Sequence, residues 1–122
     1  MIKTTLKDVA YPIEHLVFKI DDPAMVNTFI QLDELIWTTA LAKYPGFISK
    51  EVWINREVPG EVHTILIWET MEAWKSIPIE ALKVIDRQFT ETFSHPFAIV
   101  RRIHKETNHG LYKVRMTVQA NE

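Results

Sequence analysis

The side chains best suited to chemistry in this sequence are its five histidines and four tryptophans, because it has no cysteine. The absence of cysteine excludes disulfides, thiolate metal sites, iron–sulfur clusters and cysteine nucleophiles. Imidazole titrates near neutral pH and can act as a general acid or base. Tryptophan offers a large apolar surface and one N–H donor, which suits a flat ligand. The composition therefore points to proton transfer and aromatic ligands.

His15 is the candidate catalytic base. It lies in IEHLVFKI, residues 13–20, whose alternation predicts a strand with His15, Val17 and Lys19 on one face. A histidine in such a position could abstract a phenolic proton. The alternative is a structural histidine, hydrogen-bonded on a partly buried strand.

The histidine spacing does not predict a metal site. His15 and His63 are expected on neighbouring strands, but aligned strand centres would place His15 opposite a residue near Ile67. The two imidazoles would then lie about four residues apart, roughly 13 Å at 3.3 Å per residue. No H-x-x-H or H-x-x-x-H spacing occurs, and the other histidines fall at turns and strand ends: His95, His104 and His109. We expect no metal.

Three aromatic residues are predicted to line a pocket between sheet and helices. Trp68 ends a predicted strand immediately before a helix, while Trp37 and Phe89 come from the apolar stripes of two predicted helices. Such a pocket would suit a flat apolar ligand. The alternative is that the tryptophans fill the core or a dimer interface.

Other catalytic patterns are missing or weak. The sequence has no G-x-S-x-G, P-loop or G-x-G-x-x-G motif. The acidic residues of the two helices are expected on solvated faces rather than as an acid–base pair: Asp33, Glu34, Glu80, Asp86 and Glu91. Phosphate-binding and serine-hydrolase mechanisms therefore have no support.

The strands and helices that must position these residues follow one another in the order of a ferredoxin-like domain. Strands are predicted at 13–20, 47–54, 61–69 and 97–104, with helices at 23–44 and 78–93 and a helical turn at 70–77. Residues 111–118 alternate as one more half-buried strand, paired either with 97–104 or with a partner's sheet edge. This order predicts one α+β domain over 1–122, a ferredoxin-like antiparallel sheet with both helices on one face.

The sheet is predicted to bury its second face as well. Residues 65–68, Ile-Leu-Ile-Trp, are apolar on both sides of their strand, although a sheet facing water on one side should alternate. Because two helices cover one face only, a second copy of the chain is the simplest cover, giving a homodimer through the open sheet face. The alternative is that the N-terminal segment and the last strand fold back over it.

The bulk composition limits the partners. The 122 residues are 47% apolar and 25% charged with a formal net charge of −2, which is typical of a globular domain. No stretch concentrates Lys and Arg, so nucleic acid is not expected. No apolar segment is long enough for a signal or a membrane span. We expect a cytoplasmic protein.

Residues 44–77 carry a recognisable set of motifs: the helix-ending Pro45–Gly46–Phe47, the strand KEVWI, and the step from Trp68–Glu69–Thr70 into a helix bearing Ala73–Trp74. In these motifs the chain resembles the antibiotic-biosynthesis-monooxygenase-like superfamily of dimeric α/β barrels, and more narrowly a small, largely uncharacterised bacterial family within it. IEHLVFKI and ELIWTTALAKYPGF extend the resemblance to about residues 13–93. It implies a dimeric barrel with a small-molecule pocket.

The resemblance implies two chemistries. Some relatives oxidise polycyclic phenols without a cofactor, while others degrade haem with an Asn on the first strand, a Trp ending the third and a helical His on the iron. Trp68 matches that Trp by context, but His15 stands near the Asn position and the helix at 78–93 has no histidine. The sequence therefore argues against haem, and we expect no cofactor.

Two functions follow from the sequence. The first is a small-molecule enzyme or binder, such as a cofactor-independent monooxygenase acting on an aromatic substrate with His15 as base and Trp68 as pocket wall. The second is a non-catalytic ligand-binding or structural module whose dimer is the functional unit. A deep cavity beside Trp68 with a polar group aimed inward would favour the first, and a solidly packed interior would favour the second.

Overall fold

The computed structural model describes residues 2–4 and 10–119. The strands are β1 (Ile2–Thr4), β2 (Tyr11–Ile20), β3 (Phe47–Ile54), β4 (Glu61–Trp68), β5 (Phe97–Arg102), β6 (Tyr112–Lys113) and β7 (Thr117–Gln119). The helical segments are η1 (Pro23–Met25), α1 (Val26–Leu32), η2 (Asp33–Thr38), α2 (Thr39–Leu41), α3 (Met71–Lys75), α4 (Ile79–Phe93) and α5 (Ile103–Glu106).

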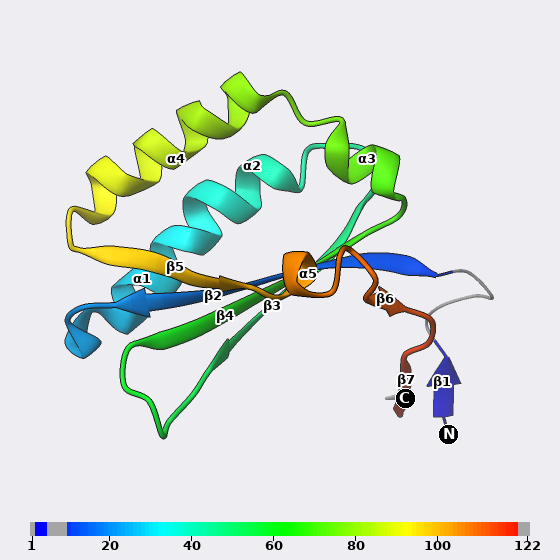
Figure 1. Cartoon of the computed structure of the whole chain (residues 1–122), viewed down its shortest axis with the longest axis horizontal. Helices are drawn as coiled ribbons and strands as arrows, with labels where there is room; N and C mark the ends of the chain where they lie inside the picture. Colours follow the sequence, from blue (N-terminus) through cyan, green and yellow to red (C-terminus); the bar gives the residue numbers. More distant parts are fainter. Residues whose placement is uncertain (1, 5–9, 120–122) are drawn as a thin grey trace.

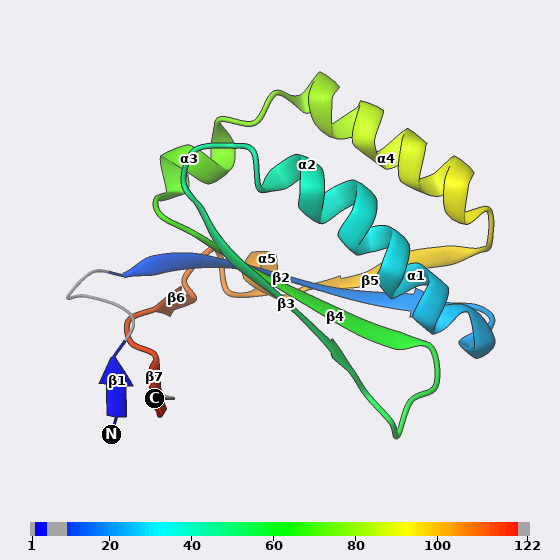
Figure 2. The same cartoon turned by 180° about the vertical axis from the view of Figure 1, so that it is seen from behind.

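The four main strands form an antiparallel sheet in the order β3-β4-β2-β5. Helices α1, α2 and α4 lie on one side of this sheet, as Figure 1 and Figure 2 show from opposite directions. The α+β, ferredoxin-like prediction is confirmed. One face of the sheet is thus open, and the other supports the helices that enclose the candidate site.

The first helical region runs from Pro23 to Leu41, close to the predicted extent of 23–44. The Asp22 carboxylate caps its start by accepting a hydrogen bond from the Ala24 N–H at 3.0 Å. The chain then turns at Gly46, whose φ of +90° suits glycine. A Cβ there would lie 2.4 Å from the Ala73 Cβ, so the close approach of α3 also requires glycine.

A cluster of phenylalanines holds the helices to the sheet. The Phe29 ring on α1 lies 5.1 Å from that of Phe89 and 5.3 Å from that of Phe93, both on α4. It also lies 5.4 Å from the ring of Phe97 on β5. Edge-to-face packing of this kind adds stability beyond the burial of area. The cluster fixes the distance between α1 and α4 at one end of the sheet.

The C-terminal part differs from its prediction. Strand β5 ends at Arg102 rather than 104, and the short helix α5 follows directly. After α5 the chain turns at Asn108 and His109, whose backbones are left-handed. Residues 111–118 do not form one strand: β6 pairs with the start of β2, and β7 pairs with β1. β6 therefore extends the sheet edge beside β2, beyond the point where β5 has ended.

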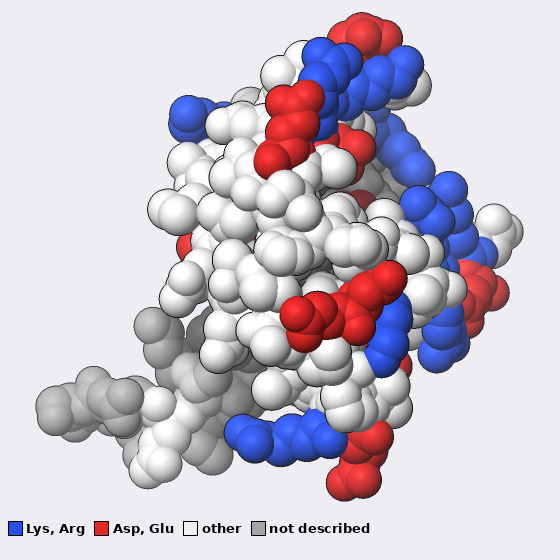
Figure 3. All heavy atoms as spheres, turned by 90° about the vertical axis from the view of Figure 1, so that its left-hand side faces the viewer, with Lys and Arg blue, Asp and Glu red and all other residues white. Residues whose placement is uncertain are grey.

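The open face carries both buried and exposed apolar residues. Ile65 and Ile67 are buried there, as two-sided burial of β4 predicts, whereas Trp53 on β3 is 49% exposed. Figure 3 views the side of the molecule that is on the left in Figure 1, where Lys and Arg are interspersed with Asp and Glu and acidic side chains also lie near the centre. In the part of the chain that is described, no helix has both the length and the apolar character needed to cross a membrane.

Candidate active site

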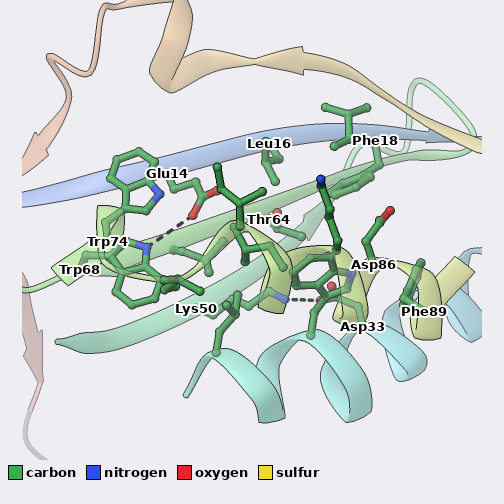
Figure 4. Close-up of a pocket in the computed structure, with 18 of the residues that line it drawn as sticks. Glu14, Leu16, Phe18, Asp33, Lys50, Thr64, Trp68, Trp74, Asp86 and Phe89 are labelled. Carbon is green, nitrogen blue, oxygen red and sulfur yellow. Dashed lines mark hydrogen bonds and ion pairs between the residues drawn. The ribbon is translucent and has the colours of Figure 1, made fainter. Parts of the chain in front are cut away.

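A cavity of about 570 Å³ lies between the covered face of the sheet and the helices. Its walls come from β2, β3, β4, β5, the helical region from Phe29 to Leu41, α3 and α4. Figure 4 looks into it. The volume falls within the range of small-molecule sites in proteins, and the walls are mostly apolar.

Aromatic side chains form much of the cavity wall. Trp37, Trp68 and Phe89, the three residues expected there, all line it, together with Trp74 of α3. Trp68 is fully buried, and the Phe47 ring packs against it edge-on at 5.7 Å. These flat surfaces suit a flat apolar ligand.

The cavity is closed at one end by contacts between α3 and the C-terminal segment. The Trp74 ring lies 5.2 Å from that of His104 and 5.3 Å from that of His109. The Lys75 Nζ lies 4.9 Å from the centroid of the Trp74 ring, within cation–π range. Residues distant in the sequence thus hold Trp74 in the wall.

Glu14 is a carboxylate on β2 that points into this apolar space. Its Oε1 accepts a hydrogen bond from Trp68 Nε1–H at 3.4 Å, drawn as a dashed line in Figure 4. Burial raises the pKa of Glu14, while the Trp68 hydrogen bond and the positive charges of Lys50 and Lys75 oppose that rise. A carboxylate in this position is a stronger base than an exposed one, because its raised pKa lets it hold a proton at higher pH.

Sequence reasoning missed Glu14, although a signal was present. The alternation of β2 puts Leu16, Phe18 and Ile20 on the covered face, and the same period puts Glu14 there. A lone acid on an otherwise apolar strand face is costly unless it has partners, so it marks a site.

Lys50 and Asp33 form a buried ion pair in the cavity wall. The Lys50 Nζ lies 2.6 Å from Asp33 Oδ2 and donates to Thr38 Oγ1 at 2.8 Å. Burial raises the pKa of Asp33, and Lys50 opposes that rise. The expectation that Asp33 lies on a solvated face is wrong, since its side chain is only 6% exposed.

The helix geometry explains how Asp33 and Thr38 reach the same ammonium group. At 3.6 residues per turn, residues five apart point about 140° away from each other. Residues Asp33–Thr38 form a π-helical segment instead, with the Thr39 N–H bonded to the Glu34 carbonyl. The wider turn brings positions five apart toward one face. A regular 3.6-residue period could not predict this pairing.

His15 lies on the other side of the sheet. None of the described residues lining the cavity is a histidine. The His15 Nε2 lies 2.9 Å from His63 Nδ1, and His63 Nε2 lies 3.0 Å from Glu61 Oε2. Burial lowers the pKa of His15, and the charges of His63 and Arg101 lower it further.

The cavity is lined instead by three carboxyl groups, those of Glu14, Asp33 and Asp86. Asp33 is paired with Lys50 and Asp86 is exposed, so Glu14 is the desolvated carboxyl that has no ion pair among the described residues.

The predicted separation of His15 and His63 is wrong. Their strands pair His15 with Ile65 and Val17 with His63, so the two histidines are diagonal neighbours rather than roughly 13 Å apart. The register differs because β2 begins at Tyr11 and β4 ends at Trp68, which moves both strand centres. Among the described residues, no group of three or more His, Asp or Glu side chains is arranged to hold a metal ion.

No protein-family model and no curated protein matches this sequence. Solved structures do match its fold. A monooxygenase from the ActVA-Orf6 gene of Streptomyces coelicolor, solved in complex with nanaomycin D, superposes with a TM-score of 0.55 at 16% identity, covering 94% of this chain and 90% of that one. This chain therefore shares its fold with that monooxygenase.

Two further solved structures share this fold. SnoaB, a cofactor-independent oxygenase from Streptomyces nogalater, has a TM-score of 0.50 at 14% identity, covering 93% of this chain and 96% of that one. A dimeric ferredoxin-like protein from an uncultured marine organism has a TM-score of 0.53 at 11% identity, covering 78% and 88%. The resemblance drawn from residues 13–93 is thus confirmed for the fold, and activity must be argued from the site.

Proposed function

We propose that this protein binds a flat, electron-rich aromatic molecule in the cavity and oxygenates it with dioxygen, without a cofactor. The observation that carries the proposal is a desolvated carboxyl, Glu14, inside a cavity walled by Trp37, Trp68 and Trp74. The fold shared with two oxygenases supports it. Glu14 replaces His15 as the proposed base because it is Glu14 that faces the cavity.

The proposed reaction begins with proton transfer to Glu14. The ring system keeps the electron pair of the broken bond as a conjugated carbanion, which donates electrons to dioxygen and forms a carbon–oxygen bond. The peroxide anion takes the proton back from Glu14 and becomes a hydroperoxide. The hydroperoxide loses water to give a quinone, so one oxygen atom stays in the product and the other leaves as water. The apolar walls exclude bulk water while the carbanion reacts.

A non-catalytic ligand-binding or structural module is the alternative function. A solidly packed interior would have favoured it, whereas the cavity beside Trp68 contains an inward polar group. A protein that only binds the ligand would need no proton acceptor with a raised pKa. The enzyme is therefore the better supported reading.

We expect the purified protein to consume dioxygen when a dihydroxyanthrone, a tricyclic phenol, is added, and to form one quinone per dioxygen. Nanaomycin D should quench the fluorescence of the cavity tryptophans. The Trp53→Phe variant is the matched control, because Trp53 is the tryptophan on the opposite face of the sheet and its loss should preserve the quenching. Ligand binding with oxidation no faster than in buffer would favour the alternative function.

We also propose a homodimer through the open sheet face, to which the C-terminal segment contributes. The support is the exposed Trp53 on that face and exposed apolar side chains beyond β5: Leu111, Tyr112, Val114 and Met116. One neighbour of this fold is itself a dimer. A stable interface would bury at least ~1,200 Å².

The Trp53→Glu variant is expected to convert the dimer into a monomer. The substitution removes the large apolar surface of the indole from the proposed interface and adds a carboxylate that would lose its hydration there. Sedimentation velocity at micromolar concentration should give twice the 14.3 kDa chain mass for the parent protein and one chain mass for the variant. A Trp53→Phe protein should remain dimeric, and a monomeric parent protein would refute the proposal.

A further inference from the structure

The Thr64 hydroxyl is a polar group in the cavity wall without a protein partner. Thr64 is 1% exposed, and its Oγ1 is buried with no hydrogen-bond partner in the described part of the chain. Buried hydroxyls are normally paired, because an unpaired one has given up its bonds to water. Thr64 lines the cavity (Figure 4). The partner it lacks would therefore be supplied by a bound molecule.

Lys50 offers a second donor to the same space. An ammonium group has three N–H donors, and Asp33 and Thr38 accept from two of them. Lys50 lines the cavity, so its third N–H, for which the described residues show no acceptor, can donate to a ligand. Asp33 and Thr38 act as positioning residues that hold the ammonium group in place.

The strand register puts Lys50 in the same row as the proposed base. Glu14 pairs with Leu66, and Leu66 pairs with Lys50, so these three residues form one row across β2, β4 and β3. Glu14 and Lys50 therefore flank Leu66, about 10 Å apart at the backbone, twice the spacing of neighbouring strands. Thr64 lies two residues along β4 from Leu66, between Glu14 and the Lys50–Asp33 pair in the view of Figure 4.

We infer that Lys50 and Thr64 form an oxyanion subsite that holds the ligand oxygen on which negative charge develops when Glu14 accepts the proton. The inference rests on the proposed function, whose substrate it specifies. The ring would lie over Leu66 with its acidic C–H or O–H at Glu14 and a conjugated carbonyl oxygen at Lys50 and Thr64. The proton passes to Glu14, and the electron pair of the broken bond spreads through the ring to that oxygen. Donors placed where charge develops stabilise the transition state.

The first test uses the parent protein and a nitronaphthol, whose naphtholate is coloured. Two aligned donors should stabilise the naphtholate, so the bound probe should ionise at lower pH than in water. An apolar cavity without such a subsite would disfavour the anion and raise that pH. A spectroscopic titration of the bound probe distinguishes the two, and ionisation at a higher pH than in water would overturn the inference.

The second test compares Thr64→Val with Thr64→Ser. Valine has the shape of threonine without its hydroxyl and should weaken naphtholate binding about 10- to 100-fold, the usual effect of one hydrogen bond to a charged group. Serine should restore it, and the methyl ether of the same naphthol should bind all three proteins equally. The valine protein should melt no lower than its parent, because it loses an unpaired hydroxyl. Equal naphtholate binding by the valine and parent proteins would refute the subsite.

The two proposals fail separately. If the protein stabilises the bound naphtholate but does not oxidise the dihydroxyanthrone, the subsite is supported and the oxygenase function is refuted. If Thr64→Val oxidises the substrate at the parent rate and binds naphtholate as tightly as the parent, the oxygenase function is supported and the subsite is refuted.

Discussion

Replacing Glu14 by glutamine is expected to slow oxidation of a dihydroxyanthrone by about 10²- to 10⁴-fold, the usual contribution of a positioned general base. Glutamine keeps an oxygen that can accept the Trp68 Nε1–H bond, so the wall of the cavity should be preserved. The amide cannot take a proton at neutral pH. Steady-state oxygen uptake measures the loss, while quenching by nanaomycin D should remain close to that of the parent protein.

The same substitution that lowers the rate should make the folded protein more stable than its parent as the pH rises. Burial raises the pKa of Glu14 above its ordinary value of 4.5, so the unfolded chain ionises at lower pH than the folded one. The parent protein therefore loses stability relative to Glu14→Gln as the pH rises from 4.5 toward the folded-state pKa. Urea unfolding at several pH values should show that the free energy of unfolding of the variant rises relative to that of the parent over this pH range.

Glu91→Gln on the exposed side of α4 is the matched control, and it should alter neither rate nor pH dependence. A Glu14→Gln protein with full oxidation activity would exclude Glu14 as the base. A variant that is less active and also less stable at neutral pH would mean that Glu14 supports the fold instead.

The overall fold was predictable because periodicity and turn residues determine it. Pro23 and Gly46 bound the first helical region, and the two-sided apolar β4 predicted burial on both faces. The cavity tryptophans were also predictable, because Trp68 closes a strand and Trp37 lies on a helical stripe. These features depend on local spacing, which the sequence carries directly.

The polar part of the site depended on features that local spacing does not carry. The π-helical segment brings Asp33 to Lys50, and no 3.6-residue pattern predicts it. The contact of His15 with His63 depended on strand ends, where a shift of one or two residues changes every cross-strand pair. The base was assigned to His15 for its residue type, whereas burial, rather than type, makes Glu14 suited to proton transfer.

Replacing Lys50 by methionine is expected to destabilise the fold by about 3–5 kcal/mol at neutral pH, because it leaves the buried Asp33 carboxylate without its cation. The Asp33 pKa is already raised by burial, and the loss of Lys50 removes the charge that opposes that rise. The penalty should therefore grow as the pH rises above the raised pKa that Asp33 has in the folded parent protein, and it should shrink as the pH falls below that pKa. Chemical denaturation between acid and neutral pH measures this dependence.

The double variant Asp33→Asn/Lys50→Met should recover much of that loss, since it leaves no buried charge, and the difference from the single variants isolates the coupling of the pair. Lys83→Met is the matched control, because Lys83 contacts Glu80 at 3.4 Å in a largely exposed pair. Exposed pairs of this kind contribute little, so its effect should stay within about 0.5 kcal/mol. If Lys50→Met were no more destabilising than Lys83→Met, Asp33 would not be a buried carboxylate that needs Lys50. The oxyanion subsite would then be unsupported, because it depends on an ammonium group that Asp33 holds in place.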